Sequence, residues 1–346
     1  MNRKDEHVSL AKAFHKEHSN DFDAVRLVHQ SFPQIDVADV SIATTVFDRS
    51  FSSPFFINAM TGGSEKTLKI NQELAEIAQA CDLMMATGSV SAALKDPSVA
   101  DSFRIVRKAN PDGFLLANIG AGSPIENAQR AVELFGADAL QIHLNAPQEL
   151  VMPEGDRQFS QWLSLLEKTM ASVAVPVVVK EVGFGMSRET IQQLLAIGVQ
   201  TIDVAGSGGT SFTQIENARR KKRELAYLDT FGQSTVISLL EANELQQPFT
   251  RIASGGVRDA YDIFKALCLG ADSVGLSATI LVLLLSKGKE ETIATLQSWK
   301  EQLQLLYTMA GQTSTKDLTK VQLIFSGAVK EWCEARQIPL AKYSLR

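Results

Sequence analysis

From about residue 54 onward, the chain repeats one unit eight times: a short apolar run that ends in small or polar residues, followed by a longer amphipathic stretch. This alternation is typical of βα units. Most of the runs are continuously apolar, as expected for parallel strands that helices cover on the outside. Eight such units predict a closed (β/α)8 or TIM barrel of the α/β class. The predicted strands are residues 55–59, 83–87, 114–118, 139–144, 177–181, 201–205, 251–253 and 273–276.

Helical signals fill the gaps between these strands. Residues 66–81 carry apolar side chains at helical spacing, Ser187 begins a Ser-Arg-Glu-Thr start sequence, and residues 259–269 end at Gly270. An open doubly wound sheet is the alternative architecture. Such a sheet would typically place a GxGxxG turn after its first strand, and that turn is absent from the sequence.

A barrel of this length commonly forms one domain, so we expect residues 1–346 to form a single domain. Residues 1–53 precede the barrel and residues from about 286 to 346 follow it. Their helical character predicts N-terminal and C-terminal helical extensions that pack against the barrel and help to close it. Two connections are unusually long, residues 146–159 and 206–232, and long βα connections in a barrel usually cover the active site.

The composition limits the partners of the chain. Its net charge of -5 at pH 7 argues against general nucleic-acid binding, because the phosphate backbone binds clustered basic faces. We find no apolar segment of signal-peptide or membrane-spanning length, and we expect a cytoplasmic protein that does not span a membrane. Cys81, Cys268 and Cys333 are odd in number and widely spaced, which indicates buried thiols. The basic run at residues 219–223 is either a solvated helix face or an anion-attracting segment.

Glycine and hydroxyl groups follow the last two predicted strands, as Ser254-Gly255-Gly256 and Ser277-Ala278. The loops at this place in a barrel often bind phosphate, because glycine admits a close anion and the next helix points its amides toward it. A plain tight turn is the alternative for either loop alone. The cluster Gly206-Ser207-Gly208-Gly209-Thr210 could add donors to the same phosphate.

The other strand ends suit a flat ring. Asn58, Ser89 and Asn118 supply small hydrogen-bonding groups, which fit the edge of a heterocycle. Lys180 follows three valines, and we expect it to point into the barrel mouth, where an anion or a polarisable ring would offset its burial. A lysine that extends to solvent is the alternative. With the phosphate loops, these groups predict flavin mononucleotide (FMN) as the cofactor.

The densest polar group of the chain follows the fourth predicted strand. His143 and Asn145 share one side of the strand by alternation, and Gln148 and Glu149 begin the long connection. Glu149 is a plausible Mg²⁺ ligand, because this cation takes few protein ligands and fills its shell with water and substrate phosphate. Four such groups within seven residues predict a functional site.

These features resemble the type 2 isopentenyl diphosphate isomerases, a family of FMN-dependent barrels. The resemblance spans nearly the whole chain. It is most specific where Arg3-Lys4-Asp5-Glu6-His7 is joined to His143-Leu144-Asn145-Ala146-Pro147-Gln148-Glu149. Less specific matches are Ala59-Met60-Thr61-Gly62-Gly63, Thr87-Gly88-Ser89, Ala117-Asn118-Ile119-Gly120, Lys180-Glu181-Val182-Gly183 and Ser254-Gly255-Gly256.

The resemblance implies an isomerase that interconverts isopentenyl and dimethylallyl diphosphate in isoprenoid biosynthesis, with reduced FMN, Mg²⁺ and NADPH as the reductant. It also implies a homo-oligomer, a tetramer or an octamer. Gln148 is the implied catalytic residue, which orients or relays protons while reduced FMN serves as acid and base. Glu149 is the implied metal ligand. The implied substrate contacts are Arg3, Lys4, His7, His143, Asn145 and Gln148. The implied flavin contacts are Ala59, Met60, Thr61, Ser89, Asn118, Lys180, Thr210, Gly255, Gly256, Ser277 and Ala278, together with Ser207, which stands where many relatives have arginine.

Two other functions are open on the same barrel. An FMN-dependent oxidoreductase of the hydroxy-acid oxidase type would carry a histidine and an arginine near a late strand, and the glycine cluster at residues 206–210 lacks histidine. An enzyme like the inosinate dehydrogenases would need a loop cysteine. A non-catalytic flavin binder would need neither the N-terminal basic segment nor Gln148 and Glu149.

Overall fold

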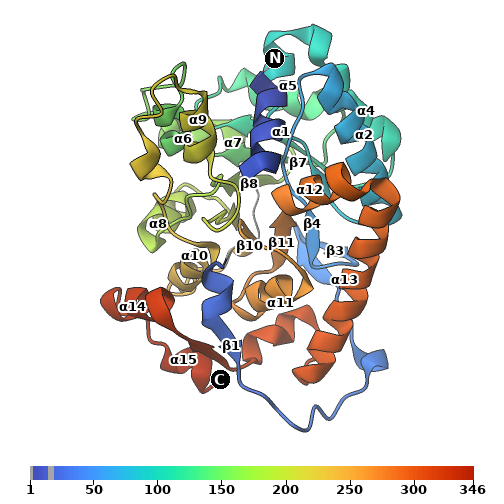
Figure 1. Ribbon diagram of the computed structural model, residues 1–346, viewed down its shortest axis with the longest axis vertical. Coiled ribbons are helices and arrows are strands. Elements are labelled where there is room, and N and C mark those ends of the chain that lie inside the picture. The colour runs from blue at the N-terminus through green and yellow to red at the C-terminus, as the bar shows by residue number, and fades with distance from the viewer. Residues whose placement is uncertain (1–2, 15–18) are drawn as a thin grey trace.

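The computed structural model describes residues 3–14 and 19–346, with only the backbone of residues 3, 4, 7, 11 and 12. Eight parallel strands close into a barrel. The order around the barrel is β10-β11-β4-β5-β6-β7-β8-β9 (Figure 1). Each strand coincides with one predicted run, so the (β/α)8 prediction is confirmed and the open sheet is wrong. The strands are β4 (Phe55–Ile57), β5 (Met85–Ala86), β6 (Leu115–Gly120), β7 (Ala139–His143), β8 (Val177–Lys180), β9 (Thr201–Asp203), β10 (Thr250–Ser254) and β11 (Ser273–Leu276).

Helices between the strands begin at capping side chains. Ser64 Oγ accepts from the Thr67 amide at the start of α2, and Asp259 accepts two amides at the start of α11. Ser187 caps α8 in the same way, as its sequence predicted. The helices after the strands include α2 (Glu65–Ala80), α3 (Ser91–Lys95), α4 (Asp101–Ala109), α5 (Glu126–Glu133), α7 (Trp162–Ala171), α8 (Arg188–Ala196), α10 (Thr235–Ala242), α11 (Ala260–Cys268) and α12 (Ala278–Lys287).

Both long connections contain helices that we did not predict. The connection after β7 holds α6 (Ala146–Val151), and Pro147 lies in its first turn, where a proline costs no hydrogen bond. The connection after β9 holds α9 (Phe212–Arg219), capped by Ser211, and the short helix η4 (Ala226–Leu228). Part of each long connection is therefore held in a helix.

The apolar interior is divided into two clusters. The larger one lies between the strands and the surrounding helices. The smaller one fills the lower part of the barrel and consists of Val46, Phe56, Met84, Ala86, Leu116, Ala139, Val178 and Ile252. A hairpin of β2 (Thr44–Val46) and β3 (Arg49–Phe51) covers this end, and its turn residues Phe47 and Asp48 have positive φ, as two-residue hairpins require. The Phe47 ring stacks on Phe114 at 5.5 Å. The N-terminal extension therefore closes the barrel floor.

The two extensions also pair with each other. In the N-terminal one, β1 (Val25–Leu27) runs antiparallel to β12 (Leu323–Phe325) of the C-terminal one. The helices of the extensions are α1 (Arg3–Phe14), η1 (Asp21–Ala24), η2 (Val37–Asp39), α13 (Lys289–Met309), η5 (Thr315–Lys320), α14 (Gly327–Ala335) and α15 (Ala341–Ser344). The predicted helical extensions are confirmed, and short strands are added to them.

The three cysteines are buried free thiols, as predicted. Within residues 3–14 and 19–346, no helix combines the length and the apolar character that crossing a bilayer would require.

Glu241 of α10 joins the C-terminal extension to the barrel. Its side chain is fully buried, and it accepts hydrogen bonds from Arg188 of α8 at 2.9 Å and from Arg336 at the end of α14 at 2.8 Å. Trp332 Nε1 donates to the same carboxylate at 3.0 Å. Burial alone would raise the pKa of Glu241, but these hydrogen bonds lower it from 4.5 to about 2.

We predict that Glu241→Gln lowers the free energy of unfolding by about 2–3 kcal/mol at pH 7, measured by urea denaturation. This is below the range of about 3–5 kcal/mol for breaking a fully buried ion pair, because both arginines remain partly exposed. Since the folded-state pKa is depressed, the contribution is present above pH 4.5 and is lost as the pH falls toward 2. The difference between wild type and variant must therefore shrink over that interval. A constant difference would contradict the assignment.

Candidate active site

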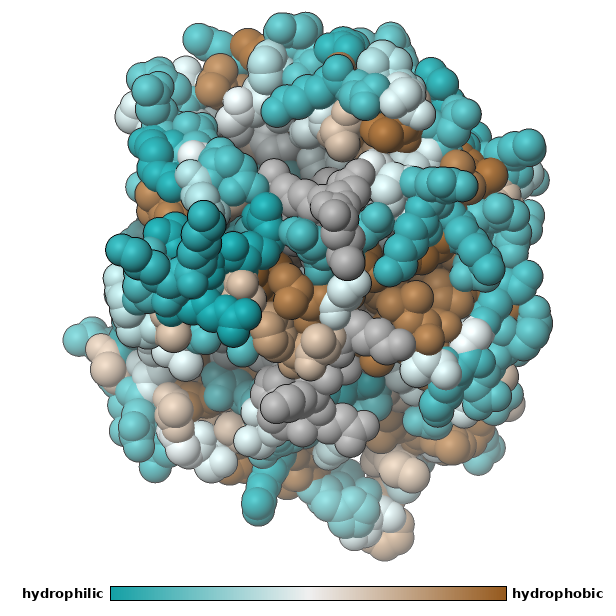
Figure 2. All heavy atoms as spheres, turned by 45° about the horizontal axis from the view of Figure 1, so that its top comes forward, coloured by the Kyte–Doolittle hydropathy of each residue, from teal (hydrophilic) through white to brown (hydrophobic). Residues whose placement is uncertain are grey.

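A cavity of about 1220 Å³ lies at the carboxyl ends of the barrel strands. Its lining includes residues at or just after all eight strand ends: Ala59, Ser89, Gly120, His143, Lys180, Ala205, Ser254 and Leu276. Figure 2 turns the top of Figure 1, where α1 lies, toward the viewer. Apolar residues are exposed in the middle of this face, and strongly hydrophilic residues gather to the left. Residues that follow each of the eight strands can therefore contact a ligand in this cavity.

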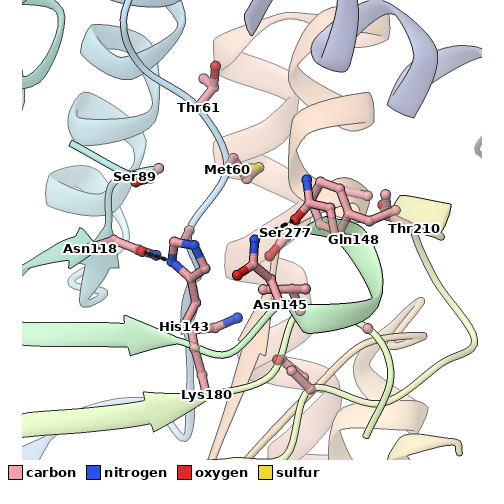
Figure 3. Close-up of a pocket in the computed structure, with 18 of the residues that line it drawn as sticks. Met60, Thr61, Ser89, Asn118, His143, Asn145, Gln148, Lys180, Thr210 and Ser277 are labelled. Carbon is pink, nitrogen blue, oxygen red and sulfur yellow. Dashed lines mark hydrogen bonds between the residues drawn. The ribbon is translucent and has the colours of Figure 1, made fainter. Parts of the chain in front are cut away.

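The structure brings most of the predicted site residues together around this cavity (Figure 3). Those that line it are Ala59, Met60, Thr61, Ser89, Asn118, His143, Asn145, Gln148, Glu149, Lys180, Thr210, Gly255, Gly256, Ser277 and Ala278. Ser207 is not among the lining residues. Its backbone amide instead donates to the Gln233 carbonyl at 2.9 Å, and its neighbours Gly206 and Gly208 face the cavity.

The N-terminal segment that bears the predicted substrate contacts Arg3, Lys4 and His7, called the arm below, is helical. Arg3, Lys4 and His7 belong to α1, and their side chains lie outside the described part of the structure. The helix contacts α2, α9 and α12, and Val8 is buried and lines the cavity. Figure 1 shows α1, in dark blue, between α9 on one side and α2 on the other. The arm therefore lies at the cavity.

A row of hydrogen bonds between polar side chains crosses the barrel interior, and all of its members are buried except the half-buried His143. It joins, in order, Ser254, Asp203, Asn58, Gln141, Asn118 and His143. Asp203 is fully buried and accepts from Ser254 Oγ at 2.7 Å and from Asn58 Nδ2 at 2.8 Å. At the other end, Asn118 Oδ1 lies 2.6 Å from His143 Nδ1. Because each amide donates to the next group, the row fixes the orientation of its members.

Gln141 and Asp203 of this row were missed in the sequence. Both lie within apolar runs, Ala-Leu-Gln-Ile-His and Thr-Ile-Asp-Val-Ala, and we interpreted those runs only as strands. The sequence feature that could have identified them is a single polar residue within an otherwise apolar strand. Such a residue must find a buried partner, since leaving it without one costs about 1–3 kcal/mol.

Lys180 is buried at the end of β8 and faces the cavity, as predicted. Its Nζ donates to the Glu181 carbonyl at 2.5 Å, which leaves two of its three N–H groups for a ligand. Burial lowers the pKa of Lys180, while Asp203 and Glu181 oppose this shift. Burial also raises the pKa of Glu181 to about 7, against hydrogen bonds from the Val182 and Phe184 amides. An anionic group in the cavity would stabilise the ammonium.

The glycines after β9 and β10 allow two loops to touch. Gly255 has φ +93°, and a Cβ there would lie 2.0 Å from the Gly206 carbonyl oxygen. A Cβ on Gly209 would lie 2.8 Å from the Gly256 amide nitrogen. We predicted these glycines for their approach to an anion, and the structure shows that contact between the loops already requires them.

The same loops fit a phosphate group. Next to them, Ser277 precedes α12, and its hydroxyl makes no capping hydrogen bond to that helix. The first amides of α12 have no acceptor within the helix and carry the positive end of its dipole. Gly255, Gly256, Ser277 and Ala278 all line the cavity. Backbone amides, a hydroxyl and a helix start therefore meet where the resemblance places the FMN phosphate.

Glu149 carries a carboxylate that is held from both sides. Oε1 accepts from Asn145 Nδ2 at 2.9 Å, and Oε2 accepts from the Asp156 amide at 2.8 Å. No group of three His, Cys, Asp or Glu side chains that could hold a metal occurs among the described residues. A Mg²⁺ ion at Glu149 would therefore depend on oxygens of water and ligand, which this cation accepts. Trp162 Nε1, which we did not predict, is a buried donor without a partner in the same part of the lining.

Gln148 has a fixed amide. Its Nε2 donates to Glu216 Oε1 at 3.0 Å, and its Oε1 accepts from Asn145 Nδ2 at 3.2 Å (Figure 3 shows the second contact). Glu216 of α9 is fully buried and also accepts from Arg219 Nη1 at 2.5 Å. Arg219, the first residue of the basic run, thus forms an ion pair with the buried carboxylate of Glu216.

The rest of the basic run is divided. Arg220 pairs with Glu224 and donates to the Val151 carbonyl at 2.9 Å. Lys221, Lys222 and Arg223 are exposed. The run is therefore not one solvated face, because Arg219 and Arg220 bind groups of the protein while the last three residues are exposed.

Comparisons with known proteins agree with this architecture. The family model described as FMN-dependent dehydrogenase matches residues 127–324. A flavocytochrome b2 mutant with pyruvate bound superposes with a TM-score of 0.68 at 19% identity, covering 94% of this chain and 83% of that one. A mandelate oxidase mutant with 2-hydroxy-phenylacetamide gives a TM-score of 0.62 at 14% identity, covering 93% and 91%. At these identities the two structures show the shared barrel fold alone.

Sequence relatives are much closer. An isopentenyl-diphosphate delta-isomerase of Latilactobacillus sakei subsp. sakei (strain 23K) is 48% identical over 339 residues, covering 98% of this chain and 97% of the relative. The enzyme of the same name from Streptomyces sp. (strain CL190) is 47% identical over 346 residues, covering 99% and 95%. The chain therefore belongs to the isopentenyl-diphosphate delta-isomerases, and its match to the FMN-dependent family identifies it with the type 2 enzymes that its sequence resembles.

Proposed function

We propose that this enzyme interconverts isopentenyl diphosphate and dimethylallyl diphosphate at the barrel mouth, with reduced FMN bound there, as a step of isoprenoid biosynthesis. The observation that carries the proposal is the identity of 46–48% to isomerases of that name over at least 97% of the chain. The FMN-dependent family match supports the cofactor. The cavity supports both, because most of the residues predicted to contact flavin and substrate line it.

We infer that the loops after β9, β10 and β11 hold the FMN phosphate through Thr210, Gly255, Gly256, Ser277 and Ala278. Around the ring, the proposed contacts are Ala59, Met60, Thr61, Ser89, Asn118 and Lys180. When bound, reduced FMN supplies an electron-rich ring that stabilises cationic charge and exchanges protons with the substrate. The Lys180 ammonium is suited to stabilise negative charge at the ring, because burial leaves it little water to interact with.

The opposite side of the mouth is the proposed substrate side. There, Arg3, Lys4 and His7 of α1 and Glu149 with Mg²⁺ would hold the diphosphate, and His143 and Asn145 would contact the substrate. Moving the double bond requires one proton to arrive at one carbon and another to leave two carbons away. Gln148 has no proton of suitable acidity, but its fixed amide can orient water or substrate for that transfer. We therefore assign Gln148 the catalytic positioning of protons.

We extend the proposal to the working form of the enzyme. NADPH would reduce the flavin, and the chain would act in the cytoplasm as a homo-oligomer, a tetramer or an octamer. Residues 1–346 would form one FMN-binding domain, with residues 1–53 as the extension that bears the substrate arm. The resemblance to type 2 enzymes supports these assignments.

The deciding experiment is incubation of the purified protein with isopentenyl diphosphate, FMN, NADPH and Mg²⁺ without oxygen. We expect dimethylallyl diphosphate to form, with no net consumption of NADPH beyond flavin reduction. Stoichiometric NADPH consumption with an oxidised or reduced product would favour the oxidoreductase alternative. Stable FMN binding without any turnover would favour the non-catalytic binder.

A glycine pair tests the phosphate site. Gly255→Ala should weaken FMN binding at least about tenfold, or 1.4 kcal/mol, because the methyl group would collide with the Gly206 carbonyl and push the two loops apart. Gly136→Ala is the matched control, since Gly136 also has positive φ (+64°) but a Cβ there meets nothing within 4 Å. Fluorescence titration of the apoprotein with FMN measures both. Equal FMN affinities would refute the phosphate assignment.

Glu149 is tested by its metal dependence. Glu149→Gln should raise the Mg²⁺ concentration needed for half-maximal activity by about tenfold, since a neutral amide binds the cation more weakly than a carboxylate. FMN content, read from absorbance, should stay at the wild-type level. Glu167→Gln, at an exposed site on α7, serves as the control. An unchanged Mg²⁺ profile would remove Glu149 from the metal site.

A further inference from the structure

Arg219, near the end of α9, holds carboxylates from three separate segments. Its Nη1 donates to Glu216 of its own helix at 2.5 Å, and its Nη2 donates to Glu154 of the connection between β7 and α7 at 2.8 Å. Its Nε reaches Glu6 of α1 at 3.4 Å. The Arg219 side chain is only 17% exposed, so these pairs are partly shielded from solvent. The three segments meet at this one side chain.

One of these contacts leads to the proposed catalytic residue. Glu216 uses its second oxygen, Oε1, to accept from Gln148 Nε2 at 3.0 Å. Because Glu216 has no exposed surface, these hydrogen bonds help to stabilise its carboxylate in place of water. A change in the position of Arg219 would therefore change the acceptor that fixes the Gln148 amide.

Another contact leads to the arm. Glu6 attaches α1 to α9, and on the other side Asp5 accepts from Ser64 Oγ at 2.7 Å, at the start of α2. Val8 of the same helix is buried and lines the cavity. The helix that carries Arg3, Lys4 and His7 is thus fastened at the cavity by two polar contacts, and Arg219 makes one of them.

We propose that Arg219 is a positioning residue that couples the seating of α1 at the cavity to the orientation of Gln148. The three nitrogens that make these contacts belong to one rigid plane, so losing Glu6 allows the whole guanidinium to turn and loosens its hold on Glu216. By linkage, a correctly held Gln148 favours the seated arm to the same extent. This inference rests on the proposed function for its kinetic consequences, while its structural consequences do not require turnover.

The test uses the full-length, FMN-bound protein with Arg219→Lys, Glu6→Gln, the double variant, Gln148→Leu and the control Lys221→Met. Lysine keeps the charge of Arg219 but cannot present three donors in one plane. Lys221 lies in the same basic run and is exposed, so its loss changes the local charge without touching α1. Two quantities are measured for each: hydrogen exchange of the α1 amides, and kcat and KM for isomerisation.

We expect Arg219→Lys to retain FMN, to speed exchange in α1 by about fivefold and to lower kcat by about tenfold. Glu6→Gln should act in the same direction, and the double variant should resemble Arg219→Lys alone, because both changes break one coupled unit. Gln148→Leu should also speed exchange in α1, as reciprocity requires. Lys221→Met should match the wild type in both measurements.

Two results would overturn the inference. One is α1 exchange in Gln148→Leu or Arg219→Lys that equals the wild-type rate. The other is additive loss of kcat in the double variant, which would make the two residues independent. If the wild type itself fails to isomerise the substrate, the proposed function fails, and the exchange measurements still decide whether Arg219 couples the arm to Gln148.

Discussion

The row of hydrogen-bonded side chains from Ser254 to His143 is the constraint on which the mouth of the barrel depends. Below it, the interior is apolar and closed by the β2–β3 hairpin; above it lies the cavity. Next to its Ser254 end, Asp203 has no exposed surface and accepts hydrogen bonds from the Ser254 and Asn58 side chains and from the Ala205 amide. The row thus lies between the packed floor of the barrel and the cavity at its mouth. Each member depends on its neighbours, because a buried polar group that loses its hydrogen-bond partner lowers the stability of the fold.

Asp203 also affects groups outside the row. It opposes the loss of charge that burial imposes on Lys180, which lies on the neighbouring strand in register with it. The cation therefore keeps an anionic partner inside the barrel while Lys180 lines the cavity. Replacing Asp203 would break two hydrogen bonds of the row and would also remove the negative charge that stabilises the Lys180 ammonium. Lys180 and the partners of Asp203 in the row all lie far from it in the sequence.

Much of the fold and of the cavity lining followed from the sequence. The eight apolar runs predicted the strands, because a parallel strand covered by helices is apolar on both faces and leaves a plain signal. The residues after each run predicted the lining, because the architecture brings all carboxyl strand ends to one face. Gln141, Asp203, Glu216 and Trp162 were not predicted, since their importance comes from partners far away in the chain. Ser207 was predicted as a flavin contact because its segment lines the cavity, but Ser207 itself is not among the lining residues, and its amide donates to the Gln233 carbonyl.

The pairing of β1 with β12 has a consequence for how the protein is made. Val25 pairs with Phe325, three hundred residues later in the chain, so β1 has no partner until nearly all of the polypeptide has left the ribosome. The barrel strands, which begin at Phe55 and end at Leu276, can assemble while the C-terminal helices are still being synthesised. Closure of the N-terminal segment against β12 is then a late, long-range event in biosynthesis. A ribosome that stops short of residue 323 would release a barrel whose first strand is an unpaired edge, open to pairing with another chain.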